Sequence, residues 1–295
     1  MKMANKVWLS VLLCIVLMNQ LQMVRGAKKK LMEVPRSMEN LCSDIKAPAL
    51  KGRKMAKLLT WLLQATNEAS LKMKSSPQHQ AACYMLFQDP RRKKTHGDRK
   101  AFRQRYALAV FFVATKGLES WYPDVGSPNA TTSAYIDEGA NPWLGNSHEC
   151  TWYGVRCESM IPFTAFTVTG LDITFFGVGG ILPREMALLE NLKEIDLHGN
   201  DLQGVIPHLA VVNWKKMETL KLNMNGFFGN LLKEMSNMKN MKELILFGNY
   251  FAGTIPRELQ KMRKLEVIDL YANQLTGRIP SELASLPKLT KLASR

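Results

Sequence analysis

The residues with the most chemical capability stand together in the stretch HECTWYGVRC, at positions 148 to 157. His148, Cys150 and Cys157 could bind a metal ion, but three candidate ligands without paired spacing do not match a structural zinc site. The two cysteines could pair with each other or remain buried, unlinked thiols. We therefore expect no metal here, and spacing alone leaves the state of the thiols open.

No stretch of the sequence carries the signature of a catalytic site. The chain lacks the phosphate-binding GxxxxGK[ST] loop, the HExxH zinc motif, the GxSxG nucleophile turn and the protein-kinase motifs. The glycine-rich GVGG at 177–180 falls inside a repeat described below. We expect no enzymatic activity and no cofactor.

Positive charge is concentrated in the N-terminal part of the chain. Against a net charge of +15 overall, residues 28–105 hold 19 Lys and Arg and 6 Asp and Glu, a net of +13. Residues 168–295 hold 16 and 13, a net of only +3. The composition therefore gives no reason to expect nucleic acid as a partner of the main fold.

The first 26 residues have the features of a secretory signal. Lysines at positions 2 and 6 precede an apolar run at 7–18, which is shorter than a membrane span, and short residues permit cleavage before Ala27. The alternative is an uncleaved membrane anchor. After cleavage four cysteines would remain, and an even number in an oxidising compartment favours disulfides. These are Cys42, Cys83, Cys150 and Cys157.

Two helices are expected before the second half of the chain. From Arg53, apolar residues fall on one face of a helix, which we expect to pack on its own domain, although a membrane surface is the alternative partner. A second, buried helix would run from a cap at Asp98 to Gly117, with Trp121 beside it. The stretch DPRRKKTHGDRK at 89–100 reads as a solvated linker, or else as a processing or nuclear import signal.

The second half of the chain is a tandem repeat. Units of 24, 25, 24, 24 and 24 residues begin at positions 168, 192, 217, 241 and 265, and a sixth begins at Leu289. Apolar residues recur at unit positions 1, 4, 6, 11, 15, 19 and 22, with Asn at 9 in four units, Gly at 13 in five and Pro at 16 in four. No unit could bury its own leucines alone, so the units must stack.

Each recurring residue type has a physical role. Positions 4 and 6 alternate along a short strand, so both point inward. An Asn amide at position 9 can donate and accept hydrogen bonds where the strand turns away, which satisfies the backbone of the adjoining coil. Gly at position 13 suits a tight bend where a side chain would collide or φ is unusual. The asparagines are Asn200, Asn225, Asn249 and Asn273, and the first unit has Phe176 instead.

The pattern LxxLxLxxNxLxGxIPxxLxxLxx resembles the plant-type, extracellular class of leucine-rich repeat over residues 143–295. This resemblance implies an α/β fold: a right-handed solenoid with a parallel strand ladder on its concave face, preceded by a small helical region and a disulfide cap. WLGNSHECTWYGVRC resembles the N-terminal cap of that class. It implies a disulfide between Cys150 and Cys157, with Trp143 and Trp152 covering the first coil.

We divide the chain into four parts on these grounds. They are a signal peptide at 1–26, a basic, partly helical or disordered segment at 27–97, a helix with the cap at 98–167, and the repeats at 168–295.

A ligand would meet the side chains between the inward leucines, because these point out of the concave strands. The candidate site residues at unit positions 5 and 7 are Asp172, Asp196, His198, Lys221, Asn223, Ile245, Phe247, Asp269 and Tyr271. Phe247 and Tyr271 are neighbours on successive strands, and exposed aromatic side chains could stack on a sugar or anchor a peptide.

We expect a non-enzymatic extracellular recognition module, secreted or at the cell surface, that binds a protein, peptide or wall polysaccharide. The resemblance implies roles such as receptor ectodomain, receptor-like protein or inhibitor of wall-degrading enzymes. The alternatives are a structural adhesion protein, and a protein tethered to membrane or nucleic acid through its basic segment. Asn129 lies in the only N-x-S/T sequon and is the expected glycosylation site.

The last unit supplies only LTKLASR. We expect this short unit to leave part of the fifth unit uncovered, specifically at Leu270, Leu275, Ile279 and Leu283. The expected consequence is a dimer through this end, or a sequence that belongs to a longer chain.

Overall fold

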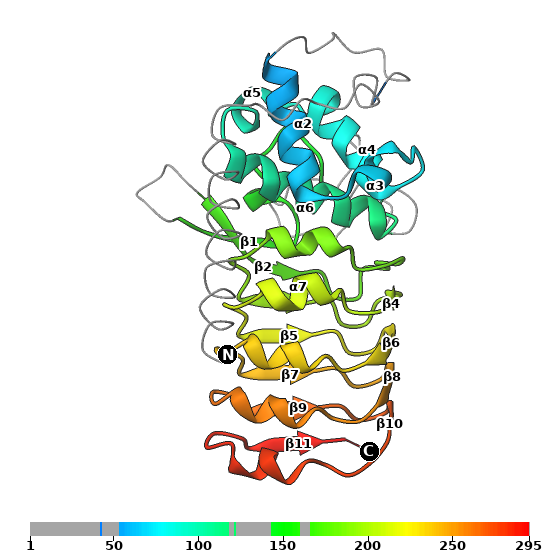
Figure 1. The fold of residues 1–295 in the computed structure, drawn as a ribbon, viewed down its shortest axis with the longest axis vertical. Helices are drawn as coiled ribbons and strands as arrows, with labels where there is room; N and C mark the ends of the chain where they lie inside the picture. The colour runs from blue at the N-terminus through cyan, green and yellow to red at the C-terminus, as the bar shows by residue number, and fades with distance from the viewer. Residues whose placement is uncertain (1–41, 43–52, 118–120, 122–142, 160–165, 295) are drawn as a thin grey trace, which may run out of the picture.

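The computed structural model describes residues 42, 53–117, 121, 143–159 and 166–294. A helical region sits on one end of a stack of coils, and the coils follow one another to the last described residues (Figure 1). The expected α/β solenoid with a parallel strand ladder is confirmed. The expected signal peptide at 1–26 lies outside the described residues.

Short helices form the region that precedes the coils. They are α2 Arg53–Ala65, α3 Glu68–Lys72, α4 Pro77–Cys83, the π-helical turn η2 Tyr84–Gln88, α5 Arg92–Thr95 and α6 Arg99–Ala114. The apolar face of α2 packs inside this region, since Leu58, Leu59 and Leu62 are buried in the cluster that the helices share. The prediction that this helix packs on its own domain is confirmed. A disulfide joins Cys42 to Cys83 at the end of α4.

The interpretation of residues 89–100 as a solvated linker is wrong. Asp89, Thr95 and His96 are all buried, and α5 lies within the stretch. Asp89 accepts a hydrogen bond from the backbone of Arg91 and forms an ion pair with Arg105. The charge pattern misled because a buried carboxylate with a cationic partner has the same sequence appearance as a solvated one.

Helix α6 connects the two cores of the molecule. Asp98 caps it as expected, accepting from the backbone of Lys100. Phe102, Tyr106, Ala109 and Val110 face the cluster of the helical region. The other side of α6 carries Ala107, Leu108, Phe111 and Phe112 into the solenoid core. Because both sides of the helix are buried, its sequence shows an apolar run and not a stripe.

Two sheets run along the solenoid in the described part of the chain. The concave sheet has the order β1-β2-β3-β5-β7-β9-β11: β1 Val155–Ser159, β2 Phe166–Asp172, β3 Glu194–Asp196, β5 Thr219–Lys221, β7 Glu243–Ile245, β9 Val267–Asp269 and β11 Lys291–Ala293. Only the β1–β2 pair is antiparallel. A second sheet has the order β10-β8-β6-β4: β4 Gln203–Gly204, β6 Gly226–Asn230, β8 Tyr250–Gly253 and β10 Gln274–Leu275.

One-turn helices close the convex side. These are η4 Arg184–Leu188, α7 His208–Asn213, η5 Lys233–Asn237, η6 Arg257–Lys261 and η7 Ser281–Ser285. Four are 3-10 turns of five residues, whereas α7 is an α-helix of six. The second unit, which has one extra residue, therefore places it in a wider helical turn.

The recurring Asn and Gly residues act as predicted. The Asn249 side chain accepts from the backbone of Phe227 at 3.0 Å and donates to the carbonyls of Leu222 and Leu246. At position 13 the glycines have positive φ, and in the last three full units a Cβ would press on the side chain from position 14 of the preceding unit. For Gly229 that neighbour is Val205, whose Cγ1 would lie 3.1 Å from the added atom. At Gly180 the added Cβ would instead lie 2.2 Å from the carbonyl oxygen of Ala114.

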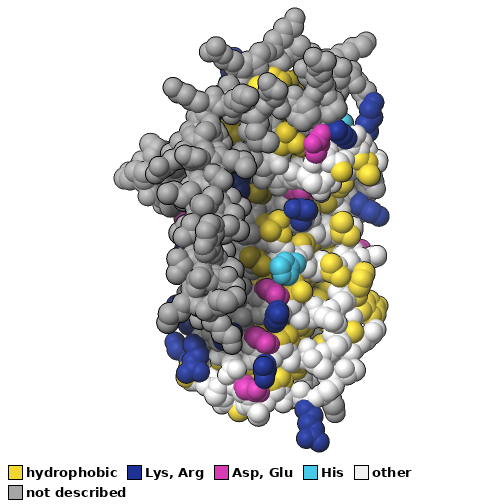
Figure 2. Space-filling model, in the orientation of Figure 1, with side chains coloured by type: hydrophobic (Ala, Val, Ile, Leu, Met, Phe, Trp, Pro, Cys, Tyr) yellow, Lys and Arg dark blue, Asp and Glu magenta, His cyan; other side chains and the backbone are white. Residues whose placement is uncertain are grey.

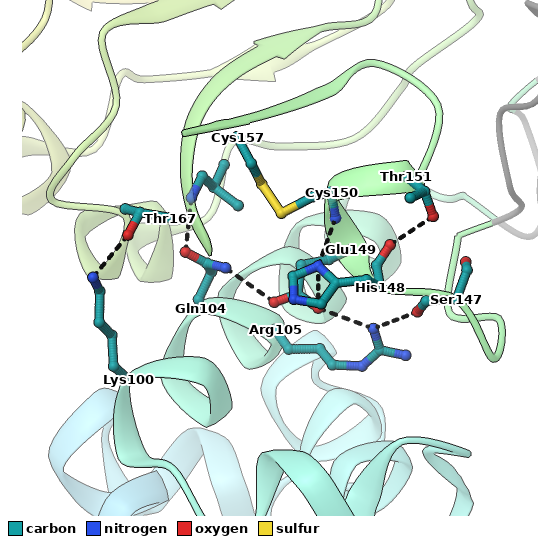
Figure 3. The surroundings of a disulfide bond; sticks show 11 residues. Lys100, Gln104, Arg105, Ser147, His148, Glu149, Cys150, Thr151, Cys157 and Thr167 are labelled. Atoms are coloured by element: carbon teal, nitrogen blue, oxygen red, sulfur yellow. Dashed lines mark hydrogen bonds and ion pairs between the residues drawn. A yellow bond between two sulfur atoms is a disulfide. The ribbon is translucent and has the colours of Figure 1, made fainter. Parts of the chain in front are cut away.

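The N-terminal cap forms as the resemblance implies. Cys150 and Cys157 are joined by a disulfide (Figure 3). Trp143 and Trp152 are buried, with ring centroids 5.2 Å apart. Gly154 has φ +72°, and a Cβ there would lie 2.2 Å from the carbonyl oxygen of Asp172. This close approach explains why the turn between the cysteines needs glycine.

A buried ion network fastens the helical region to the cap. The guanidinium of Arg105, on α6, pairs with Asp89 at 3.0 Å and with Glu149 at 3.2 Å, and it lies 4.6 Å from the centroid of the Trp152 ring. The side chains of Arg105 and Asp89 have 0% exposure. Arg105 also donates to the carbonyl of Gly145 and to that of Ser147, the latter drawn in Figure 3.

Electrostatics keeps Arg105 charged in this network. Burial lowers the pKa of Arg105, but the carboxylates of Asp89 and Glu149 and the nearby Tyr84 outweigh it, so the net shift is upward. Burial raises the pKa of Tyr84, whose hydroxyl donates to the carbonyl of Leu144. The network therefore holds a charged guanidinium between two carboxylates at neutral pH.

The far end of the solenoid is better covered than the sequence suggested. Leu270 and Leu283 are fully buried, contrary to expectation, because β11 pairs with β9 and Ala293 accepts from the backbone of Leu270. Leu275 is partly buried, and Ile279 is 48% exposed. The described part of the sixth unit thus covers Leu270 and Leu283, while Leu275 stays partly exposed and Ile279 largely so.

Candidate functional site

The concave sheet brings the nine candidate residues into one surface, which we call the concave site. Their strands are adjacent: Asp172 pairs with Asp196, Asp196 with Lys221, Lys221 with Ile245, and Ile245 with Asp269. His198, Asn223, Phe247 and Tyr271 follow two residues later on the same coils. The parallel register therefore orders the site as one row of position 5 and one row of position 7.

Charged pairs occupy the half of the concave site nearest the cap. His198 Nδ1 lies 2.7 Å from Asp196 Oδ1, and Lys221 Nζ lies 3.2 Å from Glu243 Oε2 and 4.0 Å from Asp196 Oδ2. His198 also meets the exposed ring of Phe175 edge-on at 4.8 Å. This half presents both signs of charge within reach of a ligand.

Asp172 lies at the cap end of the position-5 row, and the net shift of its pKa is upward. Burial raises its pKa, Arg156 opposes that shift, and the neighbouring carboxylates of Asp196 and Glu194 add to it. Arg156 reaches both Asp172 and Glu194 at 2.5 Å. The end of the site nearest the cap therefore places the carboxylates of Asp172 and Glu194 on one guanidinium.

Three of the candidate residues are less accessible than their position on a strand suggests. Asp196, Asn223 and Asp269 are buried, although they belong to the outward positions. Asp196 is covered by His198 and Lys221, and Asp269 pairs with Lys291 at 2.7 Å. The carboxylates of Asp196 and Asp269 hold the ammonium groups of Lys221 and Lys291 beside them.

Apolar side chains occupy the other half. Ile245 and Phe247 are partly buried, and Tyr271 is 55% exposed. The sequence identified this aromatic pair, and the structure keeps both residues on successive coils. It also shows that Tyr271 offers more surface than Phe247.

Sequence reasoning missed several polar residues that share this face. Arg156 comes from β1, an antiparallel strand of the cap that the repeat pattern does not include. Glu194 and Glu243 occupy unit position 3, and Lys291 belongs to the partial sixth unit. The alternation V-R-C-E-S after Gly154 was the available signal for the extra strand.

The described residues contain no group of three or more metal-ligating side chains. His148 accepts from the backbone of Cys150, and both cysteines are in the disulfide, so the histidine and cysteines of the cap are already committed. Among the residues that the structure describes, no helix is both long and apolar enough to span a membrane. Asn129, the expected glycosylation site, lies outside the described residues.

Comparisons with known proteins agree with this architecture. The family model described as Leucine Rich Repeat matches residues 191–210 and 264–286. The receptor-like kinase TMK4 of Arabidopsis thaliana is 41% identical over 87 residues, which cover 30% of this chain and 8% of that protein. A probable LRR receptor-like serine/threonine-protein kinase, RPK1 of the same plant, is 26% identical over 121 residues, 35% of this chain and 21% of that protein.

Solved structures extend the likeness. The LRR ectodomain of the receptor kinase SOBIR1 from Arabidopsis thaliana has a TM-score of 0.52 at 22% identity, covering 65% of this chain and 92% of that one. The structure of PEPR1–AtPEP1 has a TM-score of 0.52 at 27% identity, covering 64% of this chain and 24% of that one.

The chain thus carries leucine-rich repeats, and its solenoid has the fold of the LRR ectodomain of SOBIR1. It spans about a fifth or less of the length of these two kinase relatives. Its likeness to the kinases is confined to their ectodomain parts, which form a binding fold.

Proposed function

We propose that this chain is an extracellular recognition module whose concave site binds a peptide or a protein segment in extended form. The observation that carries the proposal is the division of the site into two halves. Paired charges around Lys221 and His198 lie at one end, and Tyr271 with Ile245 and Phe247 lies at the other. An extended peptide with one charged end and one apolar end complements such a surface.

The dimensions of the site suit a short peptide. Five strands from β2 to β9 are separated by four spacings of about 4.8 Å, so the site is about 19 Å long. An extended chain rises about 3.3 Å per residue, so about six residues would cross the whole site. The similarity to PEPR1–AtPEP1 supports a ligand of the peptide or protein class.

A selection experiment tests the proposal. The secreted chain is used to select binders from a displayed library of random seven-residue peptides, and their affinities are measured with native protein. Replacing Phe247 and Tyr271 together by Ala should weaken binding about tenfold or more, since aromatic anchors contribute strongly to interfaces. The melting temperature should stay nearly constant, because Tyr271 points away from the core.

The matched control is the double variant Phe228→Ala, Tyr250→Ala on the second sheet. Phe228 and Tyr250 are 51% and 58% exposed, so their removal takes away a comparable aromatic surface elsewhere. The control should bind the selected peptides normally. If both double variants bind equally well, or if no peptide is selected, the concave site is not the peptide-binding surface.

A further inference from the structure

The second sheet carries an aromatic row that the repeat pattern conceals. Val205, Phe228 and Tyr250 stand at three different unit positions, 14, 12 and 10. The register of the sheet shifts by two residues from coil to coil: Gly204 pairs with Phe227, and Phe228 pairs with Tyr250. Continuing the first register places Val205 opposite Phe228. The three side chains therefore lie side by side across three successive strands.

The side chains of this row are exposed, and buried aromatic side chains pack beneath them. Val205, Phe228 and Tyr250 are 54%, 51% and 58% exposed. Beneath them the alternate residues Phe227 and Phe251 are buried and stacked, with centroids 6.3 Å apart and an interplanar angle of 5°. Hydrophobic side chains gather on this side of the solenoid, where β4, β6 and β8 lie (Figure 2).

The residues around the row are uncharged, and several of them carry amide or hydroxyl groups. On one side lie Ile181 and Gln203, which form a bridge. On the other side Asn230 pairs with Ala252, and Ala252 pairs with Gln274. The outward positions of the whole face are Ile181, Gln203, Val205, Gly226, Phe228, Asn230, Tyr250, Ala252, Thr254, Gln274 and Thr276. Asp201 and Arg278 lie just beyond its two ends.

The absence of charge from these eleven positions is informative because residues 168–295 hold 16 Lys and Arg and 13 Asp and Glu. The concave face and the convex helices both carry ion pairs. Among the described residues, no hydrogen bond or ion pair occupies the side chains of Gln203, Asn230 and Gln274, which are exposed. The face therefore combines free amide groups with aromatic surface and offers nothing to an ionic ligand.

We propose that the outer face of the second sheet binds a neutral, extended polysaccharide chain. The apolar faces of successive sugar rings stack on Phe228 and Tyr250, whose strands are about 4.8 Å apart, a separation comparable with the size of one sugar ring. The amides of Gln203, Asn230 and Gln274 exchange hydrogen bonds with ring hydroxyls on either side. Because the eleven outward positions carry no cation, this face has no ionic attraction for an acidic glycan and favours a neutral one.

A hollow beside the face fits the same ligand. A pocket of about 410 Å³ opens between the second sheet and η6; Arg257 and Glu258 line its η6 side, and Asn230 and Thr254 line the side that belongs to the sheet. Asn230 and Thr254 also belong to the outward face, so a branch of the bound chain could enter the pocket without leaving the aromatic row.

The test measures depletion of the purified chain from solution by microcrystalline cellulose, a neutral and insoluble glucan, with soluble polygalacturonate as the acidic comparison. The native chain should bind cellulose, and 1 M salt should leave that binding unchanged because no ion pair is involved. The variant Phe228→Ala, Tyr250→Ala should lose about tenfold or more in association constant. The variant Tyr271→Ala, which removes a similarly exposed ring from the concave site, should bind like the native chain.

Three outcomes would overturn the proposal. The first is a native chain that does not bind cellulose, or that binds polygalacturonate in preference and is released by salt. The second is equal loss in the Tyr271 variant and the double variant. The third is a native dimer, seen by sedimentation, that the double variant dissociates, because the face would then be an interface between two copies. Circular dichroism and the melting temperature confirm that the variants are folded. The peptide-binding experiment uses the opposite pair of variants, so the two proposals can fail separately.

Discussion

The ion pairs at the junction between the helical region and the cap differ in burial from those on the concave face. At the junction between the helical region and the cap, Arg105, Asp89 and Glu149 have side-chain exposures of 0%, 0% and 2%. On the concave face, Lys221 and Glu243 are 30% and 38% exposed. The distances are almost equal, at 3.2 Å from Arg105 to Glu149 and from Lys221 to Glu243.

The two kinds of ion pair differ in whether water can solvate a charge that has lost its partner. If a partner is lost on the concave face, water solvates the remaining charge, so the pair contributes little to the free energy of unfolding. At the junction no water is available to a stranded carboxylate, so each group depends on the others. Buried pairs therefore fix the architecture, and exposed pairs leave the binding face free to vary without loss of the fold.

The largest predicted effect concerns the junction. Arg105→Met should lower the free energy of unfolding by about 3–5 kcal/mol, because Asp89 and Glu149 would stay buried without a cation. Urea unfolding followed by circular dichroism measures the loss. The matched control is Arg103→Met on the same helix, whose partner Glu190 is 58% exposed and lies at 3.6 Å. That variant should lose less than about 1 kcal/mol.

Neutralising the acids should rescue the junction. The triple variant Arg105→Met, Asp89→Asn, Glu149→Gln removes the stranded charges and should recover part of the lost stability. Equal losses for Arg105→Met and Arg103→Met would show that burial does not separate the two kinds of ion pair.

The second prediction compares the two disulfides, one in each part of the junction. Cys42–Cys83 spans 41 residues and Cys150–Cys157 spans 7. A crosslink reduces the entropy of the unfolded chain more when its loop is longer, so Cys42→Ser should cost about 4 kcal/mol and Cys150→Ser about 2 kcal/mol. Unfolding midpoints of both variants, measured beside the reduced native chain, give the order. A larger loss from Cys150→Ser would mean that the cap bond supports native packing as well as restricting the unfolded chain.

The same comparison explains how far the sequence could predict this structure. The stacking of the repeats, the Asn ladder and α6 followed from local patterns, because each obeys a short-range rule. The solenoid and the cap disulfide followed from the resemblance to a known class of repeat. The Arg105 network followed from neither, since its members are up to 60 residues apart and look like ordinary surface charges. The basic composition of the N-terminal part concealed one buried cation among many solvated ones.

The candidate site shows the same limit. Unit position correctly placed the row from Asp172 to Asp269 on adjacent strands. It did not predict that Asp196 and Asp269 would be covered by the cations beside them, or that Arg156 would enter from an antiparallel strand. On the second sheet, the two-residue shift of register aligns Val205, Phe228 and Tyr250, which no count of unit positions reveals. Cross-strand register depends on backbone pairing and not on composition.

The smallest predicted effect concerns the concave face. Lys221→Met removes a cation that lies 3.2 Å from Glu243 and 4.0 Å from Asp196. The free energy of unfolding should fall by less than about 1 kcal/mol, because water reaches both Lys221 and Glu243. A double-mutant cycle with Glu243→Gln should give a coupling energy of about 0.2–1 kcal/mol that shrinks as salt is added.

Binding of a selected peptide with an acidic end should nevertheless weaken clearly, since the ligand would lose its cationic partner. A coupling energy of about 3–5 kcal/mol, as large as the loss expected for Arg105→Met, would show that exposed and buried ion pairs do not differ in strength. Unchanged peptide binding would exclude Lys221 from the recognition surface.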